Sequence, residues 1–159
     1  GMEEAFKASG FTINAETVSA ADINLEGGLG LWDDLVIRKA EGELDYAMCA
    51  NSTNSLGCLA ASESAGRTDY KVFGIDDEAD QLAALTKENS IYYATVAQNP
   101  FEIGVQVMEA AVHAVEGQDD GIVKVDGILV TRDTVQEYMA NREKSLEELK
   151  DYLAIITAS

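Results

Sequence analysis

The sequence predicts an α/β protein with an open parallel sheet flanked by helices. Three extended apolar segments, at 44–50, 70–75 and 92–97, are each followed by a helical pattern. These helical patterns cover residues 53–64, 78–88 and 101–116. Strands that alternate with helices of this length pair in parallel through right-handed crossovers. The chain has 159 residues, of which 47% are hydrophobic, and this suits one domain with one core.

Regular patterns also flank these three units. Residues 2–9 have helical spacing before Gly10, and residues 11–13 alternate as a short strand does. A helical pattern then lies within residues 22–40. After a loop at 116–121, we expect an extended segment at 123–131 and a long amphipathic helix at 133–156.

The charge of the chain excludes several kinds of partner. It carries 29 acidic and 11 basic residues, for a formal net charge of -18. Phosphate backbones and anionic membrane surfaces are repelled by such a chain, so we expect no nucleic acid partner. No apolar run reaches the ~20 residues that a membrane-spanning helix needs, so we expect no membrane insertion. Cys49 and Cys58 are too few for a disulfide framework; we expect both to be buried, with a redox pair as the alternative.

Motifs for catalysis, metals and cofactors fit the sequence poorly. His113 lies in a helical segment without a nearby serine or cysteine to serve as a nucleophile. The glycines at 27–30 match neither the dinucleotide fingerprint nor the phosphate loop, and suit a loop or a helix start. The acidic run at 76–80 lacks the ligand pattern of a calcium loop and fits a helix N-terminus. We expect no catalytic residues, no metal and no cofactor.

Polar side chains follow each of the three predicted parallel strands. Asn51, Asp76 and Gln98 stand where the strands end, and the carboxyl ends of parallel strands meet at one edge of a sheet. We call these three residues the polar rim. A carboxylate beside two amides suits the hydroxyls of a sugar, because each hydroxyl both donates and accepts a hydrogen bond. The alternative is that Asn51 and Asp76 only cap helices.

Several motifs occur in a recognisable order: Tyr46–Asn51, Leu56–Gly57, Ala65–Arg67, Lys71–Asp76 and, the most specific of them, Ala94–Gly104. Over residues 2–138 the chain resembles the second lobe of ribose-type, type I periplasmic binding proteins of sugar ABC transporters. The resemblance implies a partial lobe of that fold. It also implies that Asn51, Asp76 and Gln98 are the residues of this lobe that contact the sugar.

The function that the resemblance implies is the non-catalytic binding of a monosaccharide or polyol, which is then passed to an ABC permease. The full-length protein would be periplasmic, or extracellular and lipid-anchored. Family members commonly have an Asn-Asp pair where this chain has Asn51 and Ser52. The opening strand of the lobe, the arginine that often follows it and the whole first lobe would precede residue 1.

The resemblance also divides the chain into three parts. Residues 1–98 would form the ligand-binding lobe, 99–132 the crossover helix and return strand shared with the first lobe, and 133–159 the C-terminal helix. Without a first lobe, the apolar side of helix 101–116 needs another cover. We expect a second copy of the chain, in a homodimer, or this lobe itself to cover Ile103, Val107, Met108, Ala111 and Val115.

Two other classes of protein stay open at this point. The effector-binding domain of a lac-repressor-type transcription regulator shares the architecture and the Gly-Ile-Asp-Asp pattern found at 74–77. The sequence Gln98-Asn99-Pro100 favours the transporter family over that regulator. A stand-alone regulatory domain that senses a ligand without transporting it is the third reading.

Overall fold

The computed structural model describes residues 2–157 of the chain, with side chains at 4–150. Gly1 and residues 158–159, at the ends of the predicted parts 1–98 and 133–159, lie outside the described residues. The elements in chain order are α1 (Met2–Ala8), α2 (Leu25–Arg38), β1 (Tyr46–Met48), α3 (Ser52–Ser64), β2 (Lys71–Ile75), α4 (Ala79–Thr86), β3 (Tyr92–Ala97), α5 (Pro100–Val115), β4 (Ile128–Thr131) and α6 (Val135–Thr157). Each predicted helix has a counterpart in this order.

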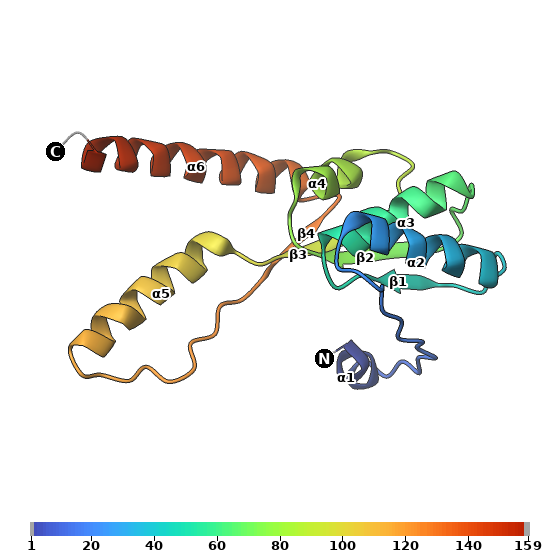
Figure 1. Ribbon diagram of the computed structural model, residues 1–159, viewed down its shortest axis with the longest axis horizontal. Coiled ribbons are helices and arrows are strands. Elements are labelled where there is room, and N and C mark those ends of the chain that lie inside the picture. Colours follow the sequence, from blue (N-terminus) through green and yellow to red (C-terminus); the bar gives the residue numbers. More distant parts are fainter. Residues whose placement is uncertain (1, 158–159) are drawn as a thin grey trace.

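The four strands form one mixed sheet in the order β1-β2-β3-β4. The pairs β1–β2 and β2–β3 are parallel, which confirms the predicted parallel units. The fourth strand departs from an all-parallel sheet, because β4 runs antiparallel to β3 with Ala97 opposite Ile128. The chain leaves the sheet after β3 through α5 and comes back to that same end of β3 (Figure 1). The returning strand therefore runs in the opposite direction.

The strand predicted at residues 11–13 is wrong, because residues 11–20 have no regular secondary structure. A three-residue alternation offers few backbone hydrogen bonds and becomes a strand only beside a neighbouring strand. The helix predicted within 22–40 begins at Leu25. Asn24 sets this start, since its side chain accepts a hydrogen bond from the N–H of Gly27 at 2.8 Å.

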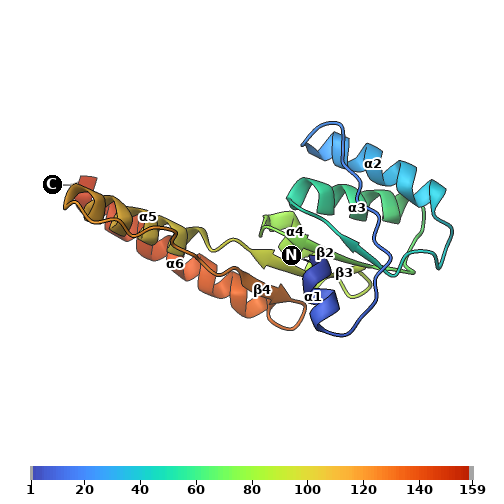
Figure 2. The ribbon, with the colours of Figure 1, turned by 90° about the horizontal axis from the view of Figure 1, so that it is seen from below.

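Helices α3 and α4 cover one face of the sheet, and α2 packs on α3 (Figures 1 and 2). Strand side chains on the covered face, such as Val72, Tyr92 and Val130, are fully buried. The opposite face, which we call the outer face, is open to solvent. Phe73 is half-buried there, and the exposed residues are Lys71 and the hydrophobic Tyr46, Met48, Ile75, Tyr93, Val96 and Leu129. Helices α2, α3 and α4 thus lie on one side of the sheet, whereas the short helix α1 lies on the side of the outer face (Figures 1 and 2).

Helices α2 and α3 approach each other backbone to backbone at two glycines. A Cβ atom at Gly57 would lie 2.5 Å from the carbonyl carbon of Gly28, and one at Gly28 would lie 2.7 Å from the carbonyl oxygen of Thr53. Gly30 on the same helix faces open space. The glycines at 27–30 lie in the first two turns of α2, which confirms the prediction of a helix start, and Gly28 sets the distance between two helices.

Arg67 joins the end of α2 to the start of β2. Its guanidinium donates hydrogen bonds to the carbonyl oxygens of Lys39 and Ala40 at 2.7 and 3.2 Å. It also pairs with the carboxylate of Asp69 at 2.6 Å, and both side chains are largely buried. The hydrogen bond from Arg67, with help from the backbone N–H of Gly42, holds the pKa of Asp69 well below its usual range.

Replacing Asp69 with Asn is expected to lower the free energy of unfolding at pH 7 by about 1–2 kcal/mol. The folded pKa of Asp69 is depressed, so its stabilisation is complete above the unfolded pKa of about 4 and is lost as pH falls through the folded value. Urea unfolding from pH 7 downward should show the two proteins converging below about pH 4. A gap that widens on acidification would contradict this assignment, and the exposed Asp80→Asn is the control.

Helix α5 extends away from the lobe, as does the distal part of α6 (Figure 1). None of the 16 residues of α5 is buried, and Val107, Met108 and Val115 are 61%, 65% and 90% exposed. The expectation that α5 folds back onto this lobe is therefore wrong. Two residues join β3 to α5, and one of them, Asn99, has the left-handed φ of 55° that turns the chain outward. No helix among the described residues is long and apolar enough to cross a membrane.

Candidate functional site

The structure brings the polar rim together at the carboxyl edge of the parallel strands. Asp76 directly follows β2 and Gln98 directly follows β3, and the side-chain amide of Gln98 donates a hydrogen bond to Oδ1 of Asp76. Oδ2 of Asp76 accepts a hydrogen bond from the N–H of Ser52 at 2.9 Å. Because Ser52 follows Asn51, Asp76 connects the ends of all three strands.

Asn51 caps helix α3. Its Oδ1 accepts hydrogen bonds from the N–H of Asn54 and from the hydroxyl of Thr53, both at 2.9 Å. The capping interpretation thus holds for the oxygen of this side chain. Its Nδ2 has no hydrogen-bond partner within the part of the chain that the structure describes, so the amide keeps two donors for a ligand.

Asp76 is held in an uncommon backbone conformation, with a φ of 81°. The Thr95 hydroxyl donates to its carbonyl oxygen at 2.6 Å, and its own N–H donates to the Val96 carbonyl at 3.0 Å. A left-handed residue other than glycine costs on the order of 1 kcal/mol and persists where its surroundings fix it. Such conformations gather at functional sites, and here the conformation is found on the central residue of the rim.

Helix α6 supports the rim through the neighbouring residue, Asp77. The hydroxyl of Tyr138 donates to Oδ2 of Asp77 at 2.7 Å, and Arg142 donates to the Asp77 carbonyl at 3.0 Å. Burial, together with the Asp77 carboxylate, raises the pKa of Tyr138, so this hydroxyl keeps its proton at neutral pH. The sequence did not predict this contact, because Tyr138 is 61 positions from Asp77 and belongs to none of the motifs.

An open depression of about 340 Å³ lies beside the rim. It is lined by Asp76, Asp77, Glu78, Gln98, Pro100 and Ile103. Its lining comes from the loop after β2, the loop after β3 and the start of α5. The depression therefore offers carboxylates and an amide on one side and apolar surface on the other, which is the usual make-up of a site for a small polar molecule.

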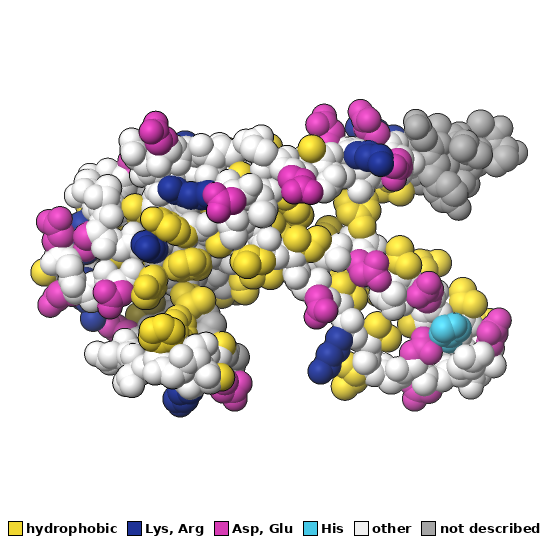
Figure 3. Space-filling model, turned by 180° about the vertical axis from the view of Figure 1, so that it is seen from behind, with side chains coloured by type: hydrophobic (Ala, Val, Ile, Leu, Met, Phe, Trp, Pro, Cys, Tyr) yellow, Lys and Arg dark blue, Asp and Glu magenta, His cyan; other side chains and the backbone are white. Residues whose placement is uncertain are grey.

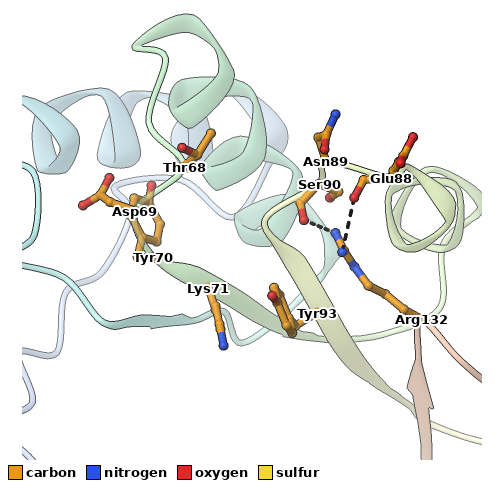
Figure 4. Close-up of a pocket in the computed structure, with 9 residues that line it drawn as sticks. All are labelled: Thr68, Asp69, Tyr70, Lys71, Glu88, Asn89, Ser90, Tyr93 and Arg132. Atoms are coloured by element: carbon orange, nitrogen blue, oxygen red, sulfur yellow. Dashed lines mark hydrogen bonds between the residues drawn. The ribbon is translucent and has the colours of Figure 1, made fainter.

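A larger depression of about 440 Å³ lies at the opposite edge, at the amino ends of β2 and β3 (Figure 4). Arg132 in its wall already donates to the backbone carbonyls of Ser90 and Tyr92. The ammonium nitrogen of Lys71 and the guanidinium carbon of Arg132 lie over the ring of Tyr93, at 4.6 and 4.9 Å from its centre. We place the candidate site at the polar rim, because open α/β sheets bind ligands at the carboxyl ends of their strands.

Groups that could carry catalysis or hold a metal do not gather among the described residues. No cluster of three or more histidine, cysteine or acidic side chains is placed there to bind an ion. His113 pairs with Asp120 at 2.7 Å on the far part of α5. Cys49 and Cys58 are buried free thiols, and burial raises the pKa of Cys58 far above its usual value. A neutral, buried thiol is a poor nucleophile.

A polar rim at the carboxyl edge of parallel strands is the place where open α/β proteins bind small ligands. The sequence model of the periplasmic binding protein domain matches residues 1–119, and the chain belongs to this family. The ribose import binding protein RbsB of Salmonella typhimurium is 30% identical over 118 residues, which are 74% of this chain and 38% of that protein. RbsB of Escherichia coli is 29% identical over the same shares. The chain thus spans 38% of the length of these curated relatives.

Solved structures of solute-binding proteins have the same fold. A protein from Agrobacterium vitis with bound allitol superposes with a TM-score of 0.71 at 23% identity, over 81% of this chain and 45% of that one. A protein from Bacillus halodurans with bound myo-inositol superposes with a TM-score of 0.63 at 30% identity, over 76% of this chain and 41% of that one. These relatives are transport proteins, so the regulator alternative gains no support from them.

Proposed function

We propose that the chain is a ligand-binding lobe for a monosaccharide or polyol in a sugar ABC transporter, and that it binds without catalysis. The observation that carries the proposal is the carboxylate of Asp76, fixed at the carboxyl edge by Ser52 and Gln98. Each oxygen of a carboxylate has a second lone pair, so both remain able to accept a hydrogen bond from a sugar hydroxyl.

The rim offers donors beside these acceptors. Asn51 contributes Nδ2, which donates to no described residue, and Gln98 contributes an exposed amide. Vicinal hydroxyls of a sugar or polyol donate and accept at once, so they match such a row of groups. A ligand that lacks these hydroxyls would leave the second lone pair of each carboxylate oxygen without a donor, and this favours polyhydroxylated ligands over apolar ones.

The organisation of the chain follows from the same proposal. We propose that residues 1–98 form the ligand-binding lobe, 99–132 the crossover helix with its return strand, and 133–159 a C-terminal helix. Two of the related structures hold allitol and myo-inositol, which supports a polyol or sugar as the ligand class. Because this chain spans 38% of its curated relatives, a second wall of the site would come from another lobe.

The proposed partners of the full-length protein are a sugar and an ABC permease. Its proposed location is the periplasm, or the cell exterior with a lipid anchor, in keeping with the family of periplasmic binding proteins. We also propose that this chain associates with a second copy of itself through α5, whose apolar side is exposed.

Titration of the isotope-labelled chain with ribose, allitol and myo-inositol, followed by NMR, tests the binding proposal. We expect the backbone amide signals of Asn51, Asp76 and Gln98 to shift most. Asp76→Asn keeps the size of the side chain and exchanges one acceptor oxygen for a donor. It should weaken binding at least tenfold, or ~1.4 kcal/mol, because hydrogen bonds to a charged acceptor are the strong ones.

The matched control is Asp80→Asn, which removes an exposed acid from the first turn of α4, away from the rim. This variant should bind as the wild type does. Equal affinity of Asp76→Asn and wild type would remove Asp76 from the site. A wild-type spectrum that none of the three ligands changes would overturn the binding proposal for this chain.

A further inference from the structure

The chain exposes far more surface than a compact protein of its size. Its solvent-accessible surface is 11029 Å². A compact monomer of 17.1 kDa would expose about 7,800 Å², so the excess is roughly 3,200 Å². Stable protein–protein interfaces bury about 800 Å² on each partner. The excess is therefore large enough for an extensive interface.

One part of this excess is the outer face of the sheet. Tyr46, Phe73 and Tyr93 form a row of rings across β1, β2 and β3, with centres 5.9 and 6.3 Å apart. Leu129 extends the apolar surface onto β4 and is 63% exposed. Parallel strands occur almost only in sheets whose two faces are both covered, usually by helices. Only the seven-residue α1 lies on this side of the sheet among the described residues, and it leaves Tyr46, Tyr93 and Leu129 exposed, so the helix layer of the outer face is incomplete.

The other part is α5, which presents its apolar side to solvent. Glu102, Gln106, Glu109 and His113 recur at intervals of three and four residues and form a narrow polar stripe. The returning chain contacts this stripe at its far end, where Asp120 pairs with His113 at 2.7 Å. Other positions on α5 carry exposed hydrophobic residues, of which Figure 3 shows a part: Phe101, Ile103, Val105, Val107, Met108, Val112 and Val115. A helix with so broad an apolar sector is normally buried.

The outer face of the sheet and the apolar side of α5 are both hydrophobic and are similar in length. The 16 residues of α5 span about 24 Å, and the six residues of β3, the longest strand, span about 20 Å. We infer that two copies of the chain exchange α5, so that each α5 lies on the outer face of the partner's sheet. Two equivalent contacts related by a two-fold axis complete both sheets at once. This deepens the self-association part of the proposed function and does not depend on sugar binding.

The net charge of the chain predicts how salt affects the proposed dimer. Each copy carries a net charge of -18, so the copies repel one another at long range. The contact surfaces themselves are mostly uncharged, and Lys71 on the outer face has no ion-pair partner among the described residues. Added salt screens the repulsion, so the dissociation constant of the dimer should fall as salt is raised.

Light scattering on three forms of the chain tests the exchange. The wild type should have twice the mass of 17.1 kDa. The helix variant, Val107→Gln with Met108→Gln, should be a monomer because α5 loses its apolar contact. The face variant, Tyr46→Thr with Leu129→Thr, should also be a monomer. All four positions are more than half exposed, and the replacements are neutral, so circular dichroism should show the fold retained.

Mixing the two monomeric variants gives the decisive result. A mixture contains one intact α5 and one intact outer face, on different chains, so the two variants should form a heterodimer. Gln106→Ala on the polar stripe is the control and should stay dimeric. A wild-type monomer at the highest attainable concentration would overturn the inference. A face variant that still dimerises alone would also overturn it, since α5 would then pair with α5.

Discussion

Replacing Arg67 with Ala is expected to lower the free energy of unfolding by about 3 kcal/mol, because it leaves a largely buried carboxylate and several carbonyls without partners. The guanidinium reaches Asp69 and the carbonyls of Lys39 and Ala40 at once. These groups lie on segments far apart in the sequence, so their loss frees the end of α2 from the start of β2. Urea unfolding at pH 7 measures the change.

Arg67→Lys should recover less than half of this loss. An ammonium group is a single point of charge and lacks the planar fork that binds a carboxylate and carbonyls together. Arg38→Ala is the matched control, because Arg38 pairs with Asp34 on the surface, with 46% and 64% of the two side chains exposed. It should cost at most about 0.5 kcal/mol. Equal losses for Arg67→Ala and Arg38→Ala would contradict the structural role of Arg67.

Replacing Gly57 with Ala is expected to destabilise the chain by about 2–3 kcal/mol, although alanine is the better helix former. The added methyl group would lie 2.5 Å from the carbonyl carbon of Gly28. Backbone atoms cannot turn aside as a flexible side chain does, so α2 must shift away from α3. Thermal or urea unfolding, with circular dichroism as the signal, measures the loss.

Gly30→Ala is the control for the change in helix propensity. Gly30 lies within α2, and no atom is found within 4 Å of the position of an added Cβ. This variant should gain up to about 1 kcal/mol. The two substitutions are chemically identical and differ in what the new methyl group meets, so the same sign for both would contradict the close approach of the helices.

Much of the fold could be predicted because local patterns and tertiary structure agree. The strand predicted at 92–97 matches β3, and the one at 70–75 differs from β2 by one residue. The failures concern long-range pairing. Residues 11–13 alternate as a strand does but have no neighbouring strand to pair with, and the direction of β4 depends on where the chain returns after α5. Neither is encoded in a local pattern.

The candidate site was predictable in its position and less so in its contacts. Parallel order alone places Asn51, Asp76 and Gln98 at one edge of the sheet. The left-handed conformation of Asp76 and its hydrogen bond with Ser52 depend on how β2 meets α3, which no spacing in the sequence specifies. The support that Tyr138 gives to Asp77 needs the packing of α6, far along the chain.

The antiparallel pairing of β3 with β4 also determines how residues 98–127, the arm that contains α5, can move. Both connections to the arm begin at paired residues, Ala97 and Ile128, which are opposite each other in the sheet. The same strand pair therefore holds both ends of the arm. The arm can bend as one unit about this edge of the sheet. Free swivelling would first require the ladder between these two strands to come apart.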